Sequence, residues 1–543
     1  MLSSRFSSLA FLSLAAIAKA GTVTYNWDVT WVWGAPDGVY RPLIGINGAW
    51  PCPKIEATSG DTVIVNLSNK LGNETSGLHF HGINQVSTQE MDGPSGVTQC
   101  PVPPGSTIKY QFVADSPGTF WYHSHNMGQY PDGLRGPLII HDPNDPFADE
   151  YDEEVVMTVS DWYHSQSLDL VRNMLQPSNT RFAPPFPDSI TVNEGQGGNI
   201  NFTKGKTYRI RLINFSAFAS AMVHFDSHDM NIIMNDASYI KKEKAYMLRI
   251  TAAQRYDFLI SCIDRDNRNF PYLIGLDTNR DFTNASLGVA WNKNYTGYLV
   301  MDPTKDLTKV DVVQEWKPID DSHFTPYDNA DAMSYNHLVE LDFAFCTDKN
   351  GYPRSCFNNV TYIAQKVPTL YSAATTGDDN QNPVVYGQVN PFIVNYGDIV
   401  QIVINNLDEA GHPFHLHGHH FQVLDRPKSG TGKWPKRDTN YASHPPRRDT
   451  VAVYGRSYGV LRFKATNPGV WLFHCHIEWH VEMGLTATFI EAPDRLKGMT
   501  FPQDHIDACK AQDIPYKGNA AGNTDNYTDT SGFITTPPTT YNG

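Results

Sequence analysis

Five His-x-His pairs constrain the fold of this chain more than any other feature of its sequence. The chain has 20 histidines in 543 residues, for which chance predicts roughly 0.7 such pairs. Each pair lies in a run typical of a strand, where successive side chains point to opposite faces. Both imidazoles of a pair should therefore share one face of a sheet. The pairs are His79/His81, His123/His125, His415/His417, His417/His419 and His474/His476.

The run that contains His474 and His476 offers two metal centres on opposite sides of one strand. These two histidines share a face, while Cys475 between them points to the other face. Cys475 and His480, with a histidine from elsewhere, make up the thiolate and imidazole set of a blue copper site. Leu485 stands where a weak axial methionine is usual, and the loss of that ligand should raise the reduction potential.

The number of histidines argues against a single structural zinc, which takes four ligands and is then complete. Instead, the quoted stretches resemble the copper-binding motifs of multicopper oxidases, most of all those of the fungal laccase and iron-transport ferroxidase branch. The resemblance spans most of the chain. The matching segments are His79-Phe-His-Gly82, Trp121-Tyr-His-Ser-His125, His412-Pro-Phe-His-Leu-His-Gly-His419 and His474 to Leu485.

The resemblance implies a cofactor of four copper ions: type 1, type 2 and a type 3 pair. His419 matches a motif position that is not a copper ligand, and we expect it to be a hydrogen-bonded strand histidine. The implied ligands are His412, Cys475 and His480 for type 1, His79 and His415 for type 2, and His81, His123, His125, His417, His474 and His476 for the type 3 pair.

The resemblance also implies the catalytic roles. Electrons from a one-electron donor would pass from Cys475 along the backbone to His474 and His476, and four of them would reduce O2 to two waters. Asp92 and Glu478 match acids that the family uses near the copper cluster, where a carboxyl group suits proton relay. The alternative is that both acids are solvated or orient a histidine.

Short alternating segments broken by Gly, Pro and Asn predict an all-β fold with three consecutive β-sandwich domains, which the resemblance identifies as cupredoxin-like Greek keys. We expect them at residues 21–144, 145–303 and 341–518, with a linker at 304–340. A repeated Gly-Asp-(Thr/Ile)-Val sequence at Gly60 and Gly397 precedes the histidine motifs of the first and third domains. The coppers should therefore lie in the third domain and at its contact with the first.

The ends of the chain predict export. Residues 1–20 form a secretory signal with an Ala18-Lys19-Ala20 cleavage site, and no other stretch approaches the roughly 20 apolar residues of a membrane span. We expect a secreted, extracellular, monomeric glycoprotein without a membrane anchor, and a disordered tail at 519–543 rich in Thr, Asn, Pro and Gly. A net charge of −15 argues against a nucleic-acid partner.

Seven cysteines leave an odd one, which is Cys475 because its thiolate is needed. The other six can form disulfides. Cys346 and Cys356 flank a turn, Cys100 and Cys509 match a laccase-like clasp between the first and last domains, and Cys52 and Cys262 remain by elimination.

The reducing substrate is open between Fe(II) and organic molecules. The motif around His79 looks closer to the iron-transport ferroxidases, which bind iron with three acids. Asp281 and Asp408 match two of them, but the run 181–185, Arg-Phe-Ala-Pro-Pro, stands where a Glu is expected. The alternative is that Asp281 and Asp408 are ordinary surface carboxylates. A hard cation prefers several oxygen ligands.

The lack of this Glu and the expected lack of a membrane anchor favour a laccase-like oxidase of phenols and aromatic amines. The alternative is a ferroxidase. A non-catalytic copper-storage protein is disfavoured, because all eleven ligands are present.

Overall fold

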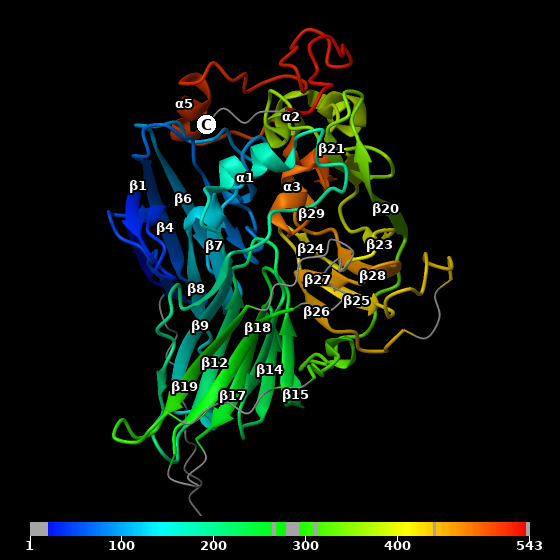
Figure 1. Ribbon diagram of the computed structural model, residues 1–543. Coiled ribbons are helices and arrows are strands. Elements are labelled where there is room, and N and C mark those ends of the chain that lie inside the picture. The colour runs from blue at the N-terminus through cyan, green and yellow to red at the C-terminus, as the bar shows by residue number, and fades with distance from the viewer. Residues whose placement is uncertain are drawn as a thin grey trace, which may run out of the picture.

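Runs of alternating apolar residues form the sheets of this chain. The computed structural model describes residues 20–262, 268–277, 293–307, 313, 315–437 and 441–538. In β6 (Thr107–Val113), for example, Ile108, Tyr110 and Phe112 are buried and their neighbours are exposed. Six sheets stack in pairs, so the prediction of an all-β chain with three sandwiches is confirmed. Figure 1 shows the first domain in blue, the second in green and the third in yellow to orange.

The first domain pairs two four-stranded sheets. One has the order β2 (Arg41–Ile46), β1 (Thr22–Gly34), β4 (Thr62–Asn69) and β6. The other has the order β3 (Ile55–Thr58), β8 (Arg135–His141), β7 (Gly118–Ser124) and β5 (Leu78–His81).

The second domain pairs a six-stranded with a five-stranded sheet. The larger has the order β10 (Ser189–Val192), β9 (Glu153–Trp162), β12 (Thr207–Asn214), β17 (Arg255–Ser261), β14 (Met230–Asn235) and β15 (Ser238–Ala245). The smaller has the order β11 (Ile200–Asn201), β19 (Asn294–Val300), β18 (Phe270–Leu276), β13 (Ala221–Phe225) and β16 (Met247–Ile250).

The third domain repeats this plan, and its first strand begins at His337, inside the segment expected to be a linker. One sheet has the order β21 (Pro353–Phe357), β20 (His337–Thr347), β23 (Ile399–Asn406), β28 (Ser457–Lys464), β25 (Phe421–Asp425) and β26 (Arg447–Arg448). The other has the order β22 (Pro391–Val394), β30 (Thr486–Glu491), β29 (Gly469–Cys475), β24 (His412–Leu416) and β27 (Thr450–Val453).

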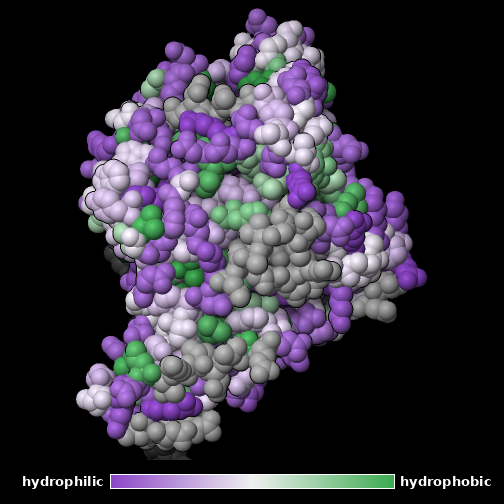
Figure 2. All heavy atoms as spheres, in the orientation of Figure 1, coloured by the Kyte–Doolittle hydropathy of each residue, from purple (hydrophilic) through white to green (hydrophobic). Residues whose placement is uncertain are grey.

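The described residues also form short helices: α1 (Ser167–Met174), α2 (Thr369–Thr375), α3 (Glu478–Glu482), α4 (Pro493–Leu496) and α5 (Gln503–Lys510). Within the described residues, no helix is long and apolar enough to cross a membrane. Figure 2 shows a face that is mostly hydrophilic, with small separate apolar patches.

A shared core holds the domains together. The core of the third domain continues into Trp121 and Tyr130 of the first domain and Phe215 of the second. Burial of such large aromatic rings is worth about 2–3 kcal/mol each. The contact between the first and third domains is therefore an extension of the hydrophobic core.

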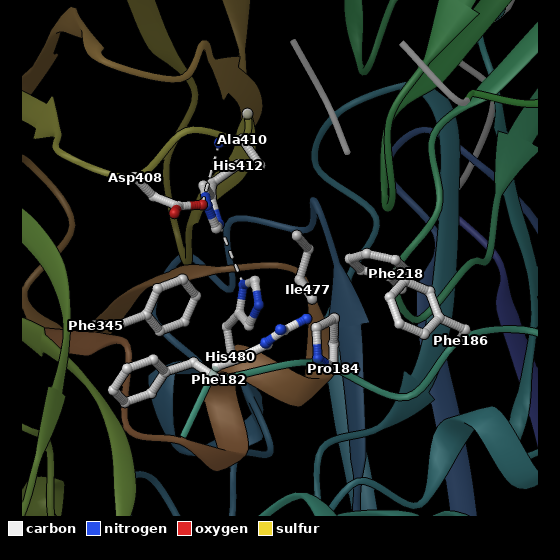
Figure 3. Close-up of a pocket in the computed structure, with 12 residues that line it drawn as sticks. Phe182, Pro184, Phe186, Phe218, Phe345, Asp408, Ala410, His412, Ile477 and His480 are labelled. Carbon is white, nitrogen blue, oxygen red and sulfur yellow. Dashed lines mark hydrogen bonds and ion pairs between the residues drawn. The ribbon is translucent and has the colours of Figure 1, made fainter. Parts of the chain in front are cut away.

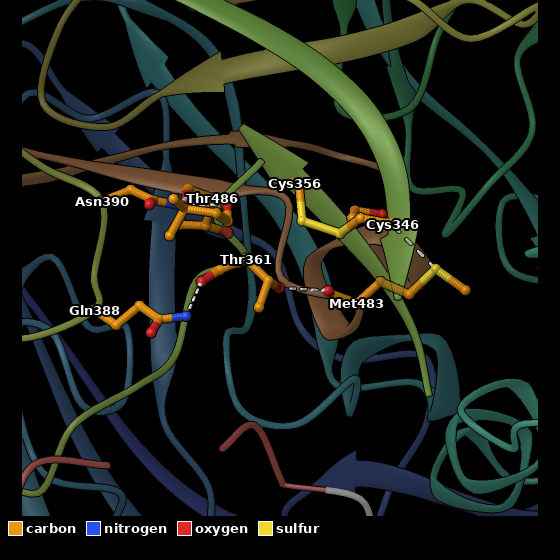
Figure 4. The surroundings of a disulfide bond; sticks show 9 residues. Cys346, Cys356, Thr361, Gln388, Asn390, Met483 and Thr486 are labelled. Atoms are coloured by element: carbon orange, nitrogen blue, oxygen red, sulfur yellow. Dashed lines mark hydrogen bonds between the residues drawn. A yellow bond between two sulfur atoms is a disulfide. The ribbon is translucent and has the colours of Figure 1, made fainter. Parts of the chain in front are cut away.

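Two of the expected disulfides are present. Cys100 is bonded to Cys509 in α5, which packs on β6 of the first domain and so ties the end of the third domain to it. Cys346 is bonded to Cys356 and joins β20 to β21 (Figure 4).

The expected disulfide between Cys52 and Cys262 is wrong. The Cys52 thiol packs in the core of the first domain. Cys262 packs in the core of the second domain, where its Sγ atom lies 2.8 Å from Sδ of Met301. The two cysteines lie in the cores of different domains, so the pairing inferred by elimination is not possible in this fold.

The segment 519–538, for which we expected disorder, packs against the third domain instead (Figure 1, red). Ala520 is buried, and its backbone N–H donates to the carbonyl oxygen of Val385 at 2.7 Å. Further along, Arg354 donates to the carbonyl oxygen of Pro538 at 3.1 Å. The polar composition of the segment 519–538 did not predict this packing, because the contacts involve backbone groups, which every residue has.

Candidate metal centres and substrate pocket

Two strand registers place paired histidines opposite one another. In the first domain His79 of β5 lies opposite His123 of β7, and in the third His415 of β24 lies opposite His474 of β29. The two sets meet across the domain contact, where the rings of His81 and His415 stack with centroids 3.8 Å apart. Because side chains alternate between the two faces of each strand, all these rings point toward the contact between the first and third domains.

Eight histidines form the resulting cluster. Burial lowers the pKa of six of them well below the ordinary value, so the rings are neutral and keep a lone pair. Their ring nitrogens form three groups whose atoms lie within 4.8 Å of one another: His79, His81 and His415; His81, His123 and His476; and His125, His417 and His474.

In four of these rings a hydrogen bond to a backbone carbonyl oxygen fixes which nitrogen carries the proton. In His79, His123, His415 and His474, Nδ1 donates to a backbone carbonyl oxygen at 2.8–2.9 Å. The Nε2 atoms of the first three are buried and have no hydrogen-bond partner among the described residues. A protonated Nδ1 with a bare Nε2 is the arrangement of metal-bound histidine.

One close contact between two histidines fits a bound cation. The Nε2 atoms of His417 and His474 lie 3.0 Å apart. Nδ1 of His417 donates to Oδ2 of Asp92 at 2.8 Å, and Nδ1 of His474 donates to the carbonyl oxygen of Cys475. With Nδ1 protonated on both rings, the two Nε2 atoms present neighbouring lone pairs, which suit a bound cation. The donor set fits a metal.

A second group lies on the other side of β29, as the alternation predicts. Sγ of Cys475 lies 3.6 Å from Nδ1 of His412 and 3.7 Å from Nδ1 of His480, and the two nitrogens are 3.1 Å apart. Burial raises the pKa of the thiol, so a bound cation is needed to hold it as thiolate. Leu485 is fully buried and offers no ligand atom.

The two acids expected to relay protons both lie near the histidine cluster. Asp92 contacts His417, and its Oδ1 lies 3.2 Å from Nδ1 of His79. Glu478 begins α3 and lines a cavity of about 320 Å³ together with His125. Burial first, and then the neighbouring Glu482, raise the pKa of Glu478 well above its ordinary value.

His419 takes no part in these groups. Its Nδ1 atom lies 3.1 Å from the carbonyl oxygen of His417, and its Nε2 atom lies 2.9 Å from Oε2 of Glu491.

Sequence reasoning missed Asp449. Its Oδ1 lies 3.2 Å from Nε2 of His81, and its backbone carbonyl accepts from Nδ1 of His415 at 2.9 Å. Burial alone would raise the pKa of this carboxyl group, but the ion pair with Arg255 of the second domain keeps it well below the ordinary value. In the sequence Arg-Arg-Asp it resembles an ordinary surface charge, so no local signal could have found it.

A pocket of about 160 Å³ opens beside the Cys475 group (Figure 3). His412 and His480 form part of its wall, and Asp408 lies next to them. His412 Nε2 donates to Oδ2 of Asp408 at 3.1 Å. Burial opposes ionisation of Asp408, but this bond and the electrostatic interaction with His412 lower the pKa of the carboxyl group. Asp281, the other expected substrate acid, lies outside the described residues.

Comparisons with known proteins decide the family. Models described as "Multicopper oxidase" match residues 28–145, 153–295 and 362–495. The chain belongs to the multicopper oxidase family. Its members' four copper ions, type 1, type 2 and a type 3 pair, are thus the cofactor, and O2 is the electron acceptor of this copper-dependent oxidoreductase.

Two relatives carry names that concern iron. The chain is 47% identical over 530 residues to "Iron transport multicopper oxidase fetC" of Epichloe festucae, which covers 96% of this chain and 85% of the relative. The crystal structure of Fet3p, titled as a multicopper oxidase that functions in iron import, matches with a TM-score of 0.89 at 36% identity over 95% of this chain and 99% of that one. The Fet3p structure has three cupredoxin-like domains in common with this multicopper oxidase, as expected.

The expectation of a laccase-like phenol oxidase is wrong. The laccase of Botrytis aclada matches with a lower TM-score of 0.76 at 28% identity, over 94% of this chain and 95% of that one. The similarity to iron-transport oxidases is higher in both sequence and structure. The carboxylate missing from the run 181–185 does not outweigh the similarity of the whole chain to iron-transport oxidases.

Proposed function

We propose that this multicopper oxidase is a ferroxidase, which oxidises Fe(II) to Fe(III) and reduces O2 to water. The names of its relatives support this function. The observation that carries it is the contact between Asp408 and His412, because it places an ionised carboxylate both in the pocket and on a residue of the thiolate group. A carboxylate oxygen is a ligand that a hard cation such as Fe(II) prefers.

We assign the copper ligands as the motifs predict. His412, Cys475 and His480 would hold the type 1 ion, and His79 and His415 the type 2 ion. Of the three histidine groups, the one with His81, His123 and His476 and the one with His125, His417 and His474 fit the type 3 pair. When bound, the copper ions supply one-electron oxidation at the first site and reduction of O2 to water at the cluster.

The protein's own residues connect these events. Asp408 holds Fe(II) one hydrogen bond from the His412 imidazole. Cys475 is bonded through the backbone to His474 and His476, which gives a short covalent path between the two groups. Glu478, whose pKa burial raises, would serve as a proton donor beside the cluster, and Asp92 orients His417.

We also propose that the chain is exported. Two disulfides within the described residues suit an oxidising compartment. The first twenty residues match a secretory signal.

Purified protein loaded with copper tests the proposal. Fe(II) should be consumed with O2 in a ratio of roughly four to one, and kcat/KM for Fe(II) should exceed that for 2,6-dimethoxyphenol at least about tenfold. Enzyme-free oxidation of Fe(II) at the same pH is subtracted. Faster turnover of the phenol than of Fe(II) would refute the proposal.

A further inference from the structure

Among the described residues, the pocket beside His412 offers a hydrated dication a single carboxylate. Of its twelve lining residues, one is a carboxylate, Asp408, one is a guanidinium, Arg181, and four are phenylalanines. Fe(II) prefers several oxygen ligands, and no second carboxylate lines the pocket in the part of the chain that the structure describes. Arg181 is exposed and repels a dication.

The phenylalanines form two apolar walls. The rings of Phe182 and Phe345 stack with centroids 5.3 Å apart and planes inclined by 16°. Phe186 and Phe218 meet edge to face at 6.0 Å. Figure 3 shows the two pairs on opposite sides of His480. These walls offer carbon surface, which suits a flat apolar molecule and not the water shell of an ion.

The backbone supports the first wall. Phe182 has φ of +54°, in the left-handed region, which a bulky side chain rarely adopts. Residues 179 and 183 hold this turn, because the side-chain oxygen of Asn179 accepts from the N–H of Ala183 at 2.9 Å and its nitrogen donates to the carbonyl of Ala183 at 3.0 Å. The loop is thus fixed in a shape that keeps an aromatic ring against Phe345.

We propose that this pocket takes Fe(II) as a complex with an organic anion that has a flat apolar face. This inference rests on the proposed ferroxidase function and names its substrate class. The anionic group of the ligand pairs with Arg181, its flat face lies on the phenylalanine walls, and the iron lies toward Asp408. Each Fe(II) complex loses one electron and leaves as the Fe(III) complex. Four such electrons, with four protons, reduce one O2 to two waters.

Two iron complexes of equal charge test the inference. Pyridine-2,4,6-tricarboxylate and nitrilotriacetate each give a one-to-one Fe(II) complex of charge −1, but only the first has an aromatic face. Hydrated Fe(II) is the third substrate. Each variant is compared with the wild type on the same substrate, so the redox potential of each complex cancels, and enzyme-free rates are subtracted.

Arg181→Glu should act in opposite directions on cation and anion. KM should rise roughly three- to tenfold for both anionic complexes and should fall for hydrated Fe(II). Lys244→Glu is the matched control, because Lys244 is an exposed residue of β15 in the second domain and the substitution changes the net charge equally. It should leave all three KM values unchanged.

Phe182→Ala tests the apolar wall. It should raise KM for the tricarboxylate complex roughly three- to tenfold more than KM for the nitrilotriacetate complex. If the wild type oxidises none of the three substrates, the ferroxidase function itself is wrong. If it oxidises hydrated Fe(II) but Arg181→Glu moves KM of all substrates in one direction or not at all, only the inference about the complex is overturned.

Discussion

Asp408→Asn isolates the charge that the ferroxidase function requires. The Asp408 side chain is only 13% exposed and accepts a hydrogen bond from His412 at 3.1 Å. The amide oxygen of Asn can still accept this bond, so the orientation of His412 is kept while the negative charge is lost. A contact with a charged group is worth about 1.5–3 kcal/mol. The variant should therefore lose roughly ten- to hundredfold in kcat/KM for hydrated Fe(II).

Initial rates of O2 uptake over a range of Fe(II) concentrations measure this loss. The blue absorption of the thiolate site must be unchanged, which confirms that His412 and Cys475 are in place. Glu409→Gln is the matched control, since Glu409 is the adjacent acid, is 54% exposed and pairs with Arg456. A loss below about twofold in Asp408→Asn, equal to that of the control, would mean that the carboxylate does not hold the iron.

Three further predictions concern the substrate pocket, the Cys475 thiolate and the stability of the fold at low pH. Pro184→Glu adds a carboxylate to the pocket wall and should raise kcat/KM for hydrated Fe(II) about tenfold; an unchanged or lower value in the same O2 assay contradicts this. Cys475→Ser should abolish the blue absorption and lower Fe(II) oxidation more than about a hundredfold, and persisting activity would reveal another electron route. Asp321→Asn should lower the free energy of unfolding by about 3 kcal/mol at pH 6. Burial opposes ionisation of Asp321, but Arg426 and Arg448 lower its pKa below the unfolded value. Its stabilising effect is therefore present above about pH 3.9 and is lost as the pH falls below that. The difference between wild type and Asp321→Asn in urea unfolding should shrink from pH 6 to pH 3, and a constant difference would be inconsistent with this ion pair.

Much of the candidate site follows from local geometry. The interval of two between His474 and His476 is enough to place both rings on one face of β29 and Cys475 on the other, because side-chain direction alternates in any strand. The same rule holds at β5 and β24. For this reason the sequence was sufficient to predict two separate groups of histidine and cysteine side chains on opposite sides of β29.

The substrate could not be derived in this way. The pocket combines Phe182 and Phe218 from the second domain with Phe345 and Asp408 from the third. No sequence spacing links these residues, so their meeting in one pocket could not be predicted from the sequence. The missing acid was therefore interpreted without the residues that surround it in the fold. Comparison with whole related chains, which integrates many such positions, corrected the result.

The sequence by itself determined the strands, the all-β class, the histidine pairs and the small disulfide loop, since each depends on residues within a few positions of one another. Only the tertiary structure decided that Asp449 lies beside His81, 368 positions away, that Cys52 and Cys262 occupy separate cores, and that the tail packs. The physical reason is that contacts between distant residues depend on how three hydrophobic cores pack together, and backbone periodicity carries no information about that packing.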